Sequence, residues 1–121
     1  MKYRKFEDLP CWQKAREMSK AVSGLLNQGP LTRDWTLKDQ IWRSAGLVMD
    51  SIAEGFDSGT VKEMDSLLGR AQGACGQLQS QLYRAVDCEY VAGEQFEAIY
   101  DLVDECRTQI KDLRHLLRKK G

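Results

Sequence analysis

The chain has 121 residues, of which 42% are hydrophobic and 30% are charged, and this composition is sufficient for one hydrophobic core. Lys and Arg number 18, as do Asp and Glu, so a uniformly basic nucleic-acid binder is excluded. The longest unbroken apolar run is about five residues, whereas a membrane-spanning helix needs roughly 20. The N-terminus lacks the apolar stretch of a secretory signal, so we expect a cytoplasmic protein without membrane contact.

The charges are distributed unevenly along the chain. Residues 1–43 carry nine Lys or Arg against five Asp or Glu, and residues 106–121 carry six against one. Residues 44–105 carry only three basic residues against twelve acidic ones. Both ends are therefore basic and the middle is acidic, which permits a local basic surface on a neutral protein.

Helix-breaking residues divide the chain at three places. The breaks are Gln28-Gly29-Pro30, Asp57-Ser58-Gly59 and Ala92-Gly93, and no strand-like alternation persists between them. This pattern predicts one all-α domain over residues 1–121, folded as an antiparallel up-down-up-down four-helix bundle. The expected helices span about residues 8–27, 36–56, 61–90 and 93–119.

The first two predicted helices carry more than one apolar stripe each. A four-helix bundle buries one stripe per helix, so the second stripe either widens the core of the monomer or forms a contact between subunits. We favour the subunit contact, because two Trp residues on an exposed face exceed the apolar surface that monomers usually tolerate. The expected interface residues are Trp35, Trp42, Met49 and Phe56 on the second helix, with Met18 and Leu25 on the first.

The third and fourth predicted helices each carry an apolar seam with a heptad repeat. The third starts at a capping box, in which Thr60 and Glu63 each satisfy a free backbone amide. The connection near residues 91–93 is short, so we expect the two seams to pack as an antiparallel hairpin. Three glycines on one face of the third helix either admit another backbone or are merely tolerated; they are Gly69, Gly73 and Gly76.

Four cysteines are present, and no two of them have the C-x-x-C spacing of zinc or redox sites. Cys75 and Cys106 lie on the seams of the third and fourth helices. If the hairpin turns near residues 91–92, the two are almost level, and their sulfurs should be buried within roughly 6 Å of each other. We interpret the pair as a packing constriction of reduced thiols in preference to a redox switch.

Catalytic and cofactor-binding motifs are missing from the sequence. His115 is the single histidine, so a metal site built from two Glu-x-x-His pairs is excluded. No phosphate-binding loop or dinucleotide motif occurs, and no nucleophile is paired with a base. We therefore expect no enzyme activity, no metal site and no cofactor.

The fourth predicted helix carries a row of basic residues within a sector of about 60°, given 100° per residue. In an up-down-up-down bundle the two chain ends meet, which would bring the basic N-terminus close to this row. The row is a candidate phosphate-binding surface, and the alternative is that cations in the last turns serve the helix dipole and solubility. Its residues are Arg107, Lys111, Arg114 and Arg118, extended by Lys119 and Lys120.

Several short motifs occur in a fixed order along the chain. They are Phe6-Glu7-Asp8-Leu9 with Trp12-Gln13-Lys14-Ala15, then Leu37-x-x-Gln40-Ile41-x-Arg43-x-Ala45, Ser51-Ile52-Ala53-Glu54-Gly55, and Ala71-x-Gly73 with Leu78-x-x-Gln81-Leu82. Together they resemble the four-helix-bundle proteins encoded by intervening sequences in bacterial 23S ribosomal RNA genes. That family is similar to the accessory variability proteins of diversity-generating retroelements.

The resemblance implies a homopentamer that binds RNA or DNA through basic surfaces, and Arg43 becomes a further candidate contact. In the retroelement relatives it also implies a reverse transcriptase as a partner. A second Arg is common in the family where this chain has Trp42, which favours a subunit contact at that position.

We therefore expect a non-enzymatic, oligomeric nucleic-acid-binding adaptor, linked to an rRNA intervening sequence or to a retroelement reverse transcriptase. The alternative is an oligomeric protein–protein interaction scaffold without nucleic-acid binding. In that case the acidic middle of the chain would meet a basic partner protein.

Overall fold

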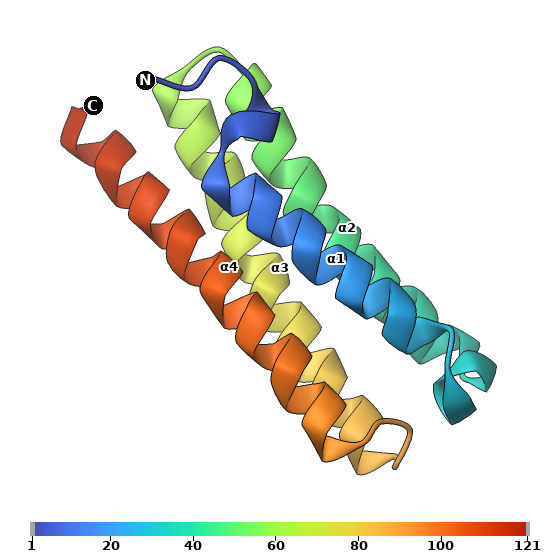
Figure 1. Cartoon of the computed structure of the whole chain (residues 1–121). Helices are drawn as coiled ribbons and strands as arrows, with labels where there is room; N and C mark the ends of the chain where they lie inside the picture. The colour runs from blue at the N-terminus through green and yellow to red at the C-terminus, as the bar shows by residue number, and fades with distance from the viewer. Residues whose placement is uncertain (1, 121) are drawn as a thin grey trace.

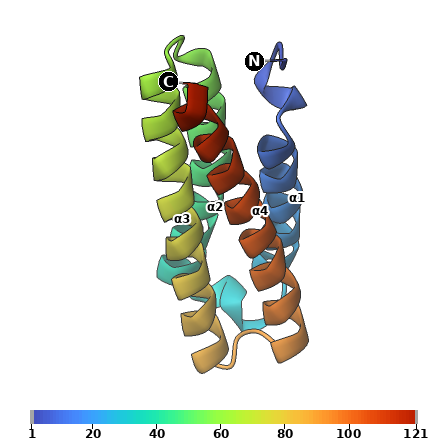
Figure 2. The ribbon, with the colours of Figure 1, turned by 90° about the vertical axis from the view of Figure 1, so that its left-hand side faces the viewer.

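The computed structural model describes residues 2–120, with side chains described for residues 2–119, and over this range its regular secondary structure consists of helices. The prediction of an all-α protein with four long helices is confirmed. Figure 1 and Figure 2 show these helices lying along one another, with both chain ends at the same end of the molecule. In chain order the elements are the 3-10 helix η1 (Phe6–Asp8), α1 (Pro10–Leu26), the 3-10 helix η2 (Gly29–Arg33), α2 (Trp35–Asp57), α3 (Val61–Asp87) and α4 (Gly93–Lys120).

The helices pack around one core. α2 packs along α1 and α3, and α4 packs along α3 and α1, so α2 and α4 occupy opposite corners. The predicted seams line this core: Leu68 and Leu82 of α3 and Ile110 of α4 are at most 1% exposed. Burial of each such side chain contributes roughly 1.5–3 kcal/mol to the stability of the folded state. No helix within residues 2–120 is long and apolar enough to cross a membrane.

Side-chain caps fix the starts of two helices. The Thr60 hydroxyl accepts a hydrogen bond from the Glu63 backbone N–H at 3.1 Å, as predicted for the start of α3. Asp34 caps α2 in the same way, by accepting from the Leu37 N–H at 3.1 Å. Its second carboxylate oxygen accepts from the Tyr90 hydroxyl at 3.0 Å, which ties the α3–α4 connection to the start of α2. This hydrogen bond also raises the pKa of Tyr90.

The helix limits differ from the sequence expectation where local backbone chemistry intervenes. α1 begins at Pro10, because residues 6–8 turn as a 3-10 helix and proline suits the first helical position, where no N–H is needed. α3 ends at Asp87, three residues earlier than predicted. Glu89 adopts a left-handed φ of 62° just beyond it, and such a conformation terminates a helix.

The two core cysteines behave as the hairpin register predicts. Cys75 and Cys106 are both fully buried, which confirms that part of the prediction, while the distance between their sulfurs stays a prediction. The neighbouring Cys75 thiol and burial together raise the pKa of Cys106. Cys11 joins them: its backbone carbonyl accepts from the Cys106 thiol at 3.7 Å, and burial raises its own pKa to about 12. All three are free cysteines buried in the packed interior.

One glycine, and not the predicted trio, marks the closest approach of two helices. A Cβ placed on Gly55 of α2 would lie 3.2 Å from the Leu67 Cβ and 3.3 Å from the Met64 carbonyl oxygen of α3. On α3 itself, a Cβ on Gly73 or Gly76 would meet no atom within 4 Å. Within this chain those two glycines therefore admit no second backbone.

Gly55→Ala should destabilise the protein by roughly 1–3 kcal/mol, because the added methyl group overpacks the α2–α3 contact against a backbone atom. Gly46→Ala is the matched control on the same helix, since a Cβ there meets nothing within 4 Å. The control should stabilise by about 1 kcal/mol through helix propensity alone. Urea unfolding of the two variants measures both changes, and equal effects would contradict the packing assigned to Gly55.

Candidate nucleic-acid interface

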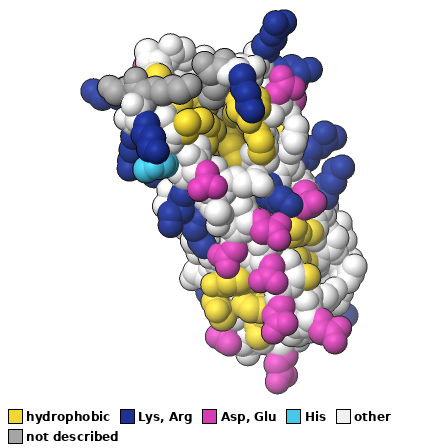
Figure 3. Space-filling model, turned by 60° about the vertical axis from the view of Figure 1, so that its left-hand side comes forward, with side chains coloured by type: hydrophobic (Ala, Val, Ile, Leu, Met, Phe, Trp, Pro, Cys, Tyr) yellow, Lys and Arg dark blue, Asp and Glu magenta, His cyan; other side chains and the backbone are white. Residues whose placement is uncertain are grey.

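The predicted basic row of α4 lies along the side of the helix that faces α3. Figure 3 shows Lys and Arg side chains gathered towards the end of the molecule where the chain termini meet, and acidic side chains towards the other end. The hydrogen bonds divide the row into cations engaged with α3 and cations that form no ion pair within residues 2–119.

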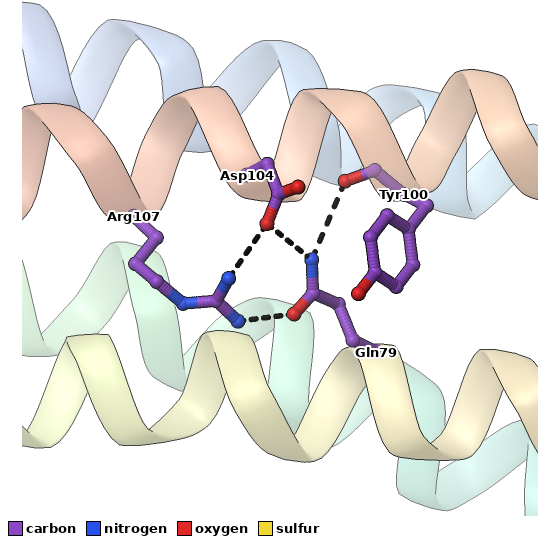
Figure 4. A network of polar contacts seen from close by, with 4 residues as sticks. All are labelled: Gln79, Tyr100, Asp104 and Arg107. Atoms are coloured by element: carbon purple, nitrogen blue, oxygen red, sulfur yellow. Dashed lines mark hydrogen bonds and ion pairs between the residues drawn. The ribbon is translucent and has the colours of Figure 1, made fainter.

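Arg107 is held in a polar network between α3 and α4, shown in Figure 4. It forms an ion pair with Asp104 at 2.6 Å and donates a second hydrogen bond to the Gln79 side-chain oxygen. The Gln79 amide nitrogen in turn donates to Asp104 Oδ1 at 2.8 Å and to the Tyr100 carbonyl oxygen at 3.5 Å. Gln79 is buried, so these contacts satisfy a polar group that would otherwise cost roughly 1–3 kcal/mol.

The structure thus gives Arg107 a role inside the chain, and its contact with nucleic acid stays a prediction. Its guanidinium is neutralised by Asp104 and occupied by Gln79, and three quarters of its side chain is covered. Arg107 serves the contact between the two helices.

Arg114 is engaged in the same manner one layer nearer the chain ends. Its Nε donates to Asp65 Oδ1 at 2.9 Å and its Nη1 donates to Gln72 Oε1 at 3.0 Å. A Cβ on Gly69 would lie 3.1 Å from the guanidinium, so the glycine makes room for this side chain. The Arg114 hydrogen bond lowers the pKa of Asp65, with the charge of Arg118 adding to the effect.

The remaining cations of α4 are accessible. Arg118 reaches Asp65 at 3.4 Å but stays 61% exposed, and Lys111 and Lys119 are exposed. Within residues 2–119, no ion pair involves either lysine. The Lys120 side chain lies outside the described residues. Lys111, Arg118 and His115 also line a polar depression of about 380 Å³, together with Gln72, Asp112 and Arg114.

Arg43 is not brought together with this row. It lies on α2, at the corner of the bundle opposite α4, and pairs with Asp39 one helical turn away at 2.7 Å. This exposed i, i+4 pair is of a kind that contributes little to stability.

The predicted interface residues divide into two groups. Trp35 and Trp42 are 75% and 49% exposed, and they line a depression of about 320 Å³ near the end of α1. Met49 and Phe56 are half-buried and pack against the core. These four residues leave an apolar strip on α2 that the rest of the described chain covers only in part.

Met18 and Leu25 are wrongly assigned to that interface. Both are buried inside the single chain, at 0% and 5% exposure. The physical reason is that α1 packs against both α2 and α4, so its apolar arc must cover two neighbours. For α1, the wider core is the correct alternative.

Asp65 and Gln79 are the site residues that the sequence analysis missed. The available signal was the hairpin register itself: a turn near residues 91–92 puts Asp65 level with Arg118 and Gln79 level with Asp104. Among the described side chains, no cluster of three His, Cys, Asp or Glu residues could hold a metal ion.

The Asp65–Arg114 pair predicts a defined acid sensitivity. Because the folded-state pKa of Asp65 is lowered, its contribution to stability is complete at neutral pH and is lost as the pH falls below 3.8 towards the lowered pKa. Thermal unfolding should show Asp65→Asn less stable than the wild type at pH 7, with the difference shrinking in acid. A difference that stays constant down to pH 2 would contradict the ion pair.

Comparison with known proteins agrees with the resemblance in the motifs. A search of curated proteins finds no match. The family model described as 23S rRNA-intervening sequence protein matches residues 7–112, which run from within η1 through most of α4 and include the quoted motifs except Phe6. A match over this much of the chain shows membership, and the chain belongs to the 23S rRNA-intervening sequence protein family.

Proposed function

We propose that this protein is a non-enzymatic accessory protein that binds nucleic acid through the free cations at the C-terminal end of α4. The observation that carries the proposal is the division of the basic row. Asp104 and Asp65 engage Arg107 and Arg114, while Lys111 and Lys119 remain exposed. Exposed, mobile cations are the groups that contact phosphates without sequence preference.

The size of the surface fits several phosphates. Lys111 and Lys119 are eight residues apart, which is about 12 Å along an α-helix. That distance equals roughly three to four phosphate steps along one strand at about 3.4 Å each. Arg118 and His115 lie between them and can add one contact each, so each subunit offers a short stretch of phosphate contacts. The family name makes structured ribosomal RNA the first nucleic acid to test.

The proposal includes an antiparallel up-down-up-down order of the helices and assembly into a homo-oligomer. The common position of the chain ends in Figure 1 supports the helix order, and it brings the exposed Lys2, Arg4 and Lys5 to the basic end. The exposed Trp35 and Trp42 support assembly, and the pentamer number comes from the family resemblance. Assembly would repeat the basic surface, so that weak contacts on each subunit add up. A cytoplasmic location and a link to a reverse transcriptase are further parts of the proposal.

Reversing two free charges should weaken binding of structured RNA and lower its salt dependence. For Lys111→Glu with Lys119→Glu, the slope of log K against log salt should fall by about two, since each lost phosphate contact removes about 0.7–0.9. Lys20→Glu with Arg33→Glu is the matched control, because it makes the same change of charge at two exposed residues of α1 and η2, outside the α4 row. Gel-shift titrations over a salt series measure both variants against wild type, with duplex DNA in parallel.

Two results would contradict the nucleic-acid proposal: binding without a salt slope, or equal losses in the test and control variants. Affinity purification that recovers partner protein but no nucleic acid would favour the alternative, an interaction scaffold. The acidic middle of the chain is the feature that supports this alternative.

The assembly proposal predicts a mass several times 13.8 kDa by light scattering at micromolar concentration. Trp42→Glu should reduce that mass, because it puts a charge into an apolar contact. Glu17→Lys on exposed α1 surface is a control that should leave the mass unchanged. A monomeric wild type would contradict the proposed interface.

A further inference from the structure

A cluster of three aromatic rings lies on the α3/α4 face at the end opposite the basic row. The ring centroids of Tyr83 and Phe96 are 4.9 Å apart, those of Phe96 and Tyr100 are 5.4 Å apart, and those of Tyr83 and Tyr100 are 5.7 Å apart. Tyr83 is 51% exposed, while the other two rings are half-buried against the helices. The mutual contacts hold the rings in place, and they leave an aromatic surface open to another molecule.

Exposed acidic residues lie close to this aromatic cluster along the sequences of α3 and α4. Glu97 and Asp101 directly follow Phe96 and Tyr100 on α4, and both are exposed. Asp87 lies one helical turn beyond Tyr83, and Glu94 is in the first turn of α4. None of these four carboxylates forms an ion pair with a side chain of residues 2–119. Figure 3 shows hydrophobic side chains among acidic ones at this end of the molecule.

The chemistry of this surface selects the charge of its occupant. The face of an aromatic ring attracts a cation, and nearby carboxylates strengthen that attraction. An uncharged apolar partner would cover the carboxylates without pairing them, and a nucleic acid would be repelled by them. A guanidinium group should bind this surface more tightly than an ammonium group, because its flat face stacks on a ring while its edge pairs with a carboxylate.

We propose that the Tyr83–Phe96–Tyr100 cluster and its acidic rim form a docking surface for an arginine-rich segment of a partner protein. The occupant is a different protein, because the exposed cations of this chain's own α4 are the ones assigned to phosphate contacts. The choice of occupant therefore rests on the proposed function, whereas the docking surface itself lies at the other end of the helix pair from the nucleic-acid surface.

Calorimetric titration of the full-length protein with short synthetic peptides tests the proposal. An arginine-rich peptide should bind more tightly than a lysine-rich peptide of equal length and charge, and a glutamate-rich peptide should not bind. Tyr83→Ala should weaken arginine-peptide binding about two- to fivefold, whereas Tyr83→Phe should retain it. Glu97→Gln with Asp101→Asn should also weaken binding and flatten its salt dependence.

Trp35→Ala is the control for a general loss of exposed aromatic surface, and it should bind the arginine peptide as wild type does. Circular dichroism melts show whether each variant is folded. Equal binding of the arginine and lysine peptides, or unchanged binding by Tyr83→Ala, would overturn the proposal. A fall in the protein's own mass on Tyr83→Ala would assign the surface to a second copy and would overturn it as well.

Discussion

The side chains that cross from α4 to α3 fix these two helices in one register, and the properties of their shared face follow from it. On the α3 side, the buried amide of Gln79 has its hydrogen-bond partners on α4 in this register. A shift of one helical turn would separate Gln79 from Asp104 and Asp65 from Arg114. Buried polar groups without partners are costly, so these contacts oppose such a shift while the apolar seams supply most of the stability.

The same register separates the charges of the face along its length. At the end with the chain termini, Asp65 forms ion pairs with Arg114 and with the largely exposed Arg118. Lys111 and Lys119 are exposed at the same end. Near the turn between the helices lie the aromatic cluster and four acidic residues that form no ion pair within residues 2–119. One helix pair therefore presents two surfaces of opposite charge, about a helix length apart.

Much of this architecture could be predicted from the sequence. Heptad spacing identified the seams of α3 and α4, and the short connection placed Cys75 beside Cys106. Applied to every polar residue, the same register would also have paired Gln79 with Asp104. Periodicity failed for Met18 and Leu25, because it gives the width of an apolar arc and not the neighbours that cover it. Periodicity also could not distinguish one α4 cation from another, because the acidic partner of each cation lies on another helix and is known only once the helices are packed.

The division of the α4 cations into structural and free groups is the central claim, and unfolding free energies of single variants test it most directly. Arg107→Gln and Arg114→Gln should each lower the unfolding free energy by about 1–3 kcal/mol, because each leaves partners on α3 unsatisfied. Lys111→Gln and Lys119→Gln should stay within about 0.5 kcal/mol of wild type. Four variants with the same small effect, or lysine variants as damaging as the arginine ones, would contradict the account.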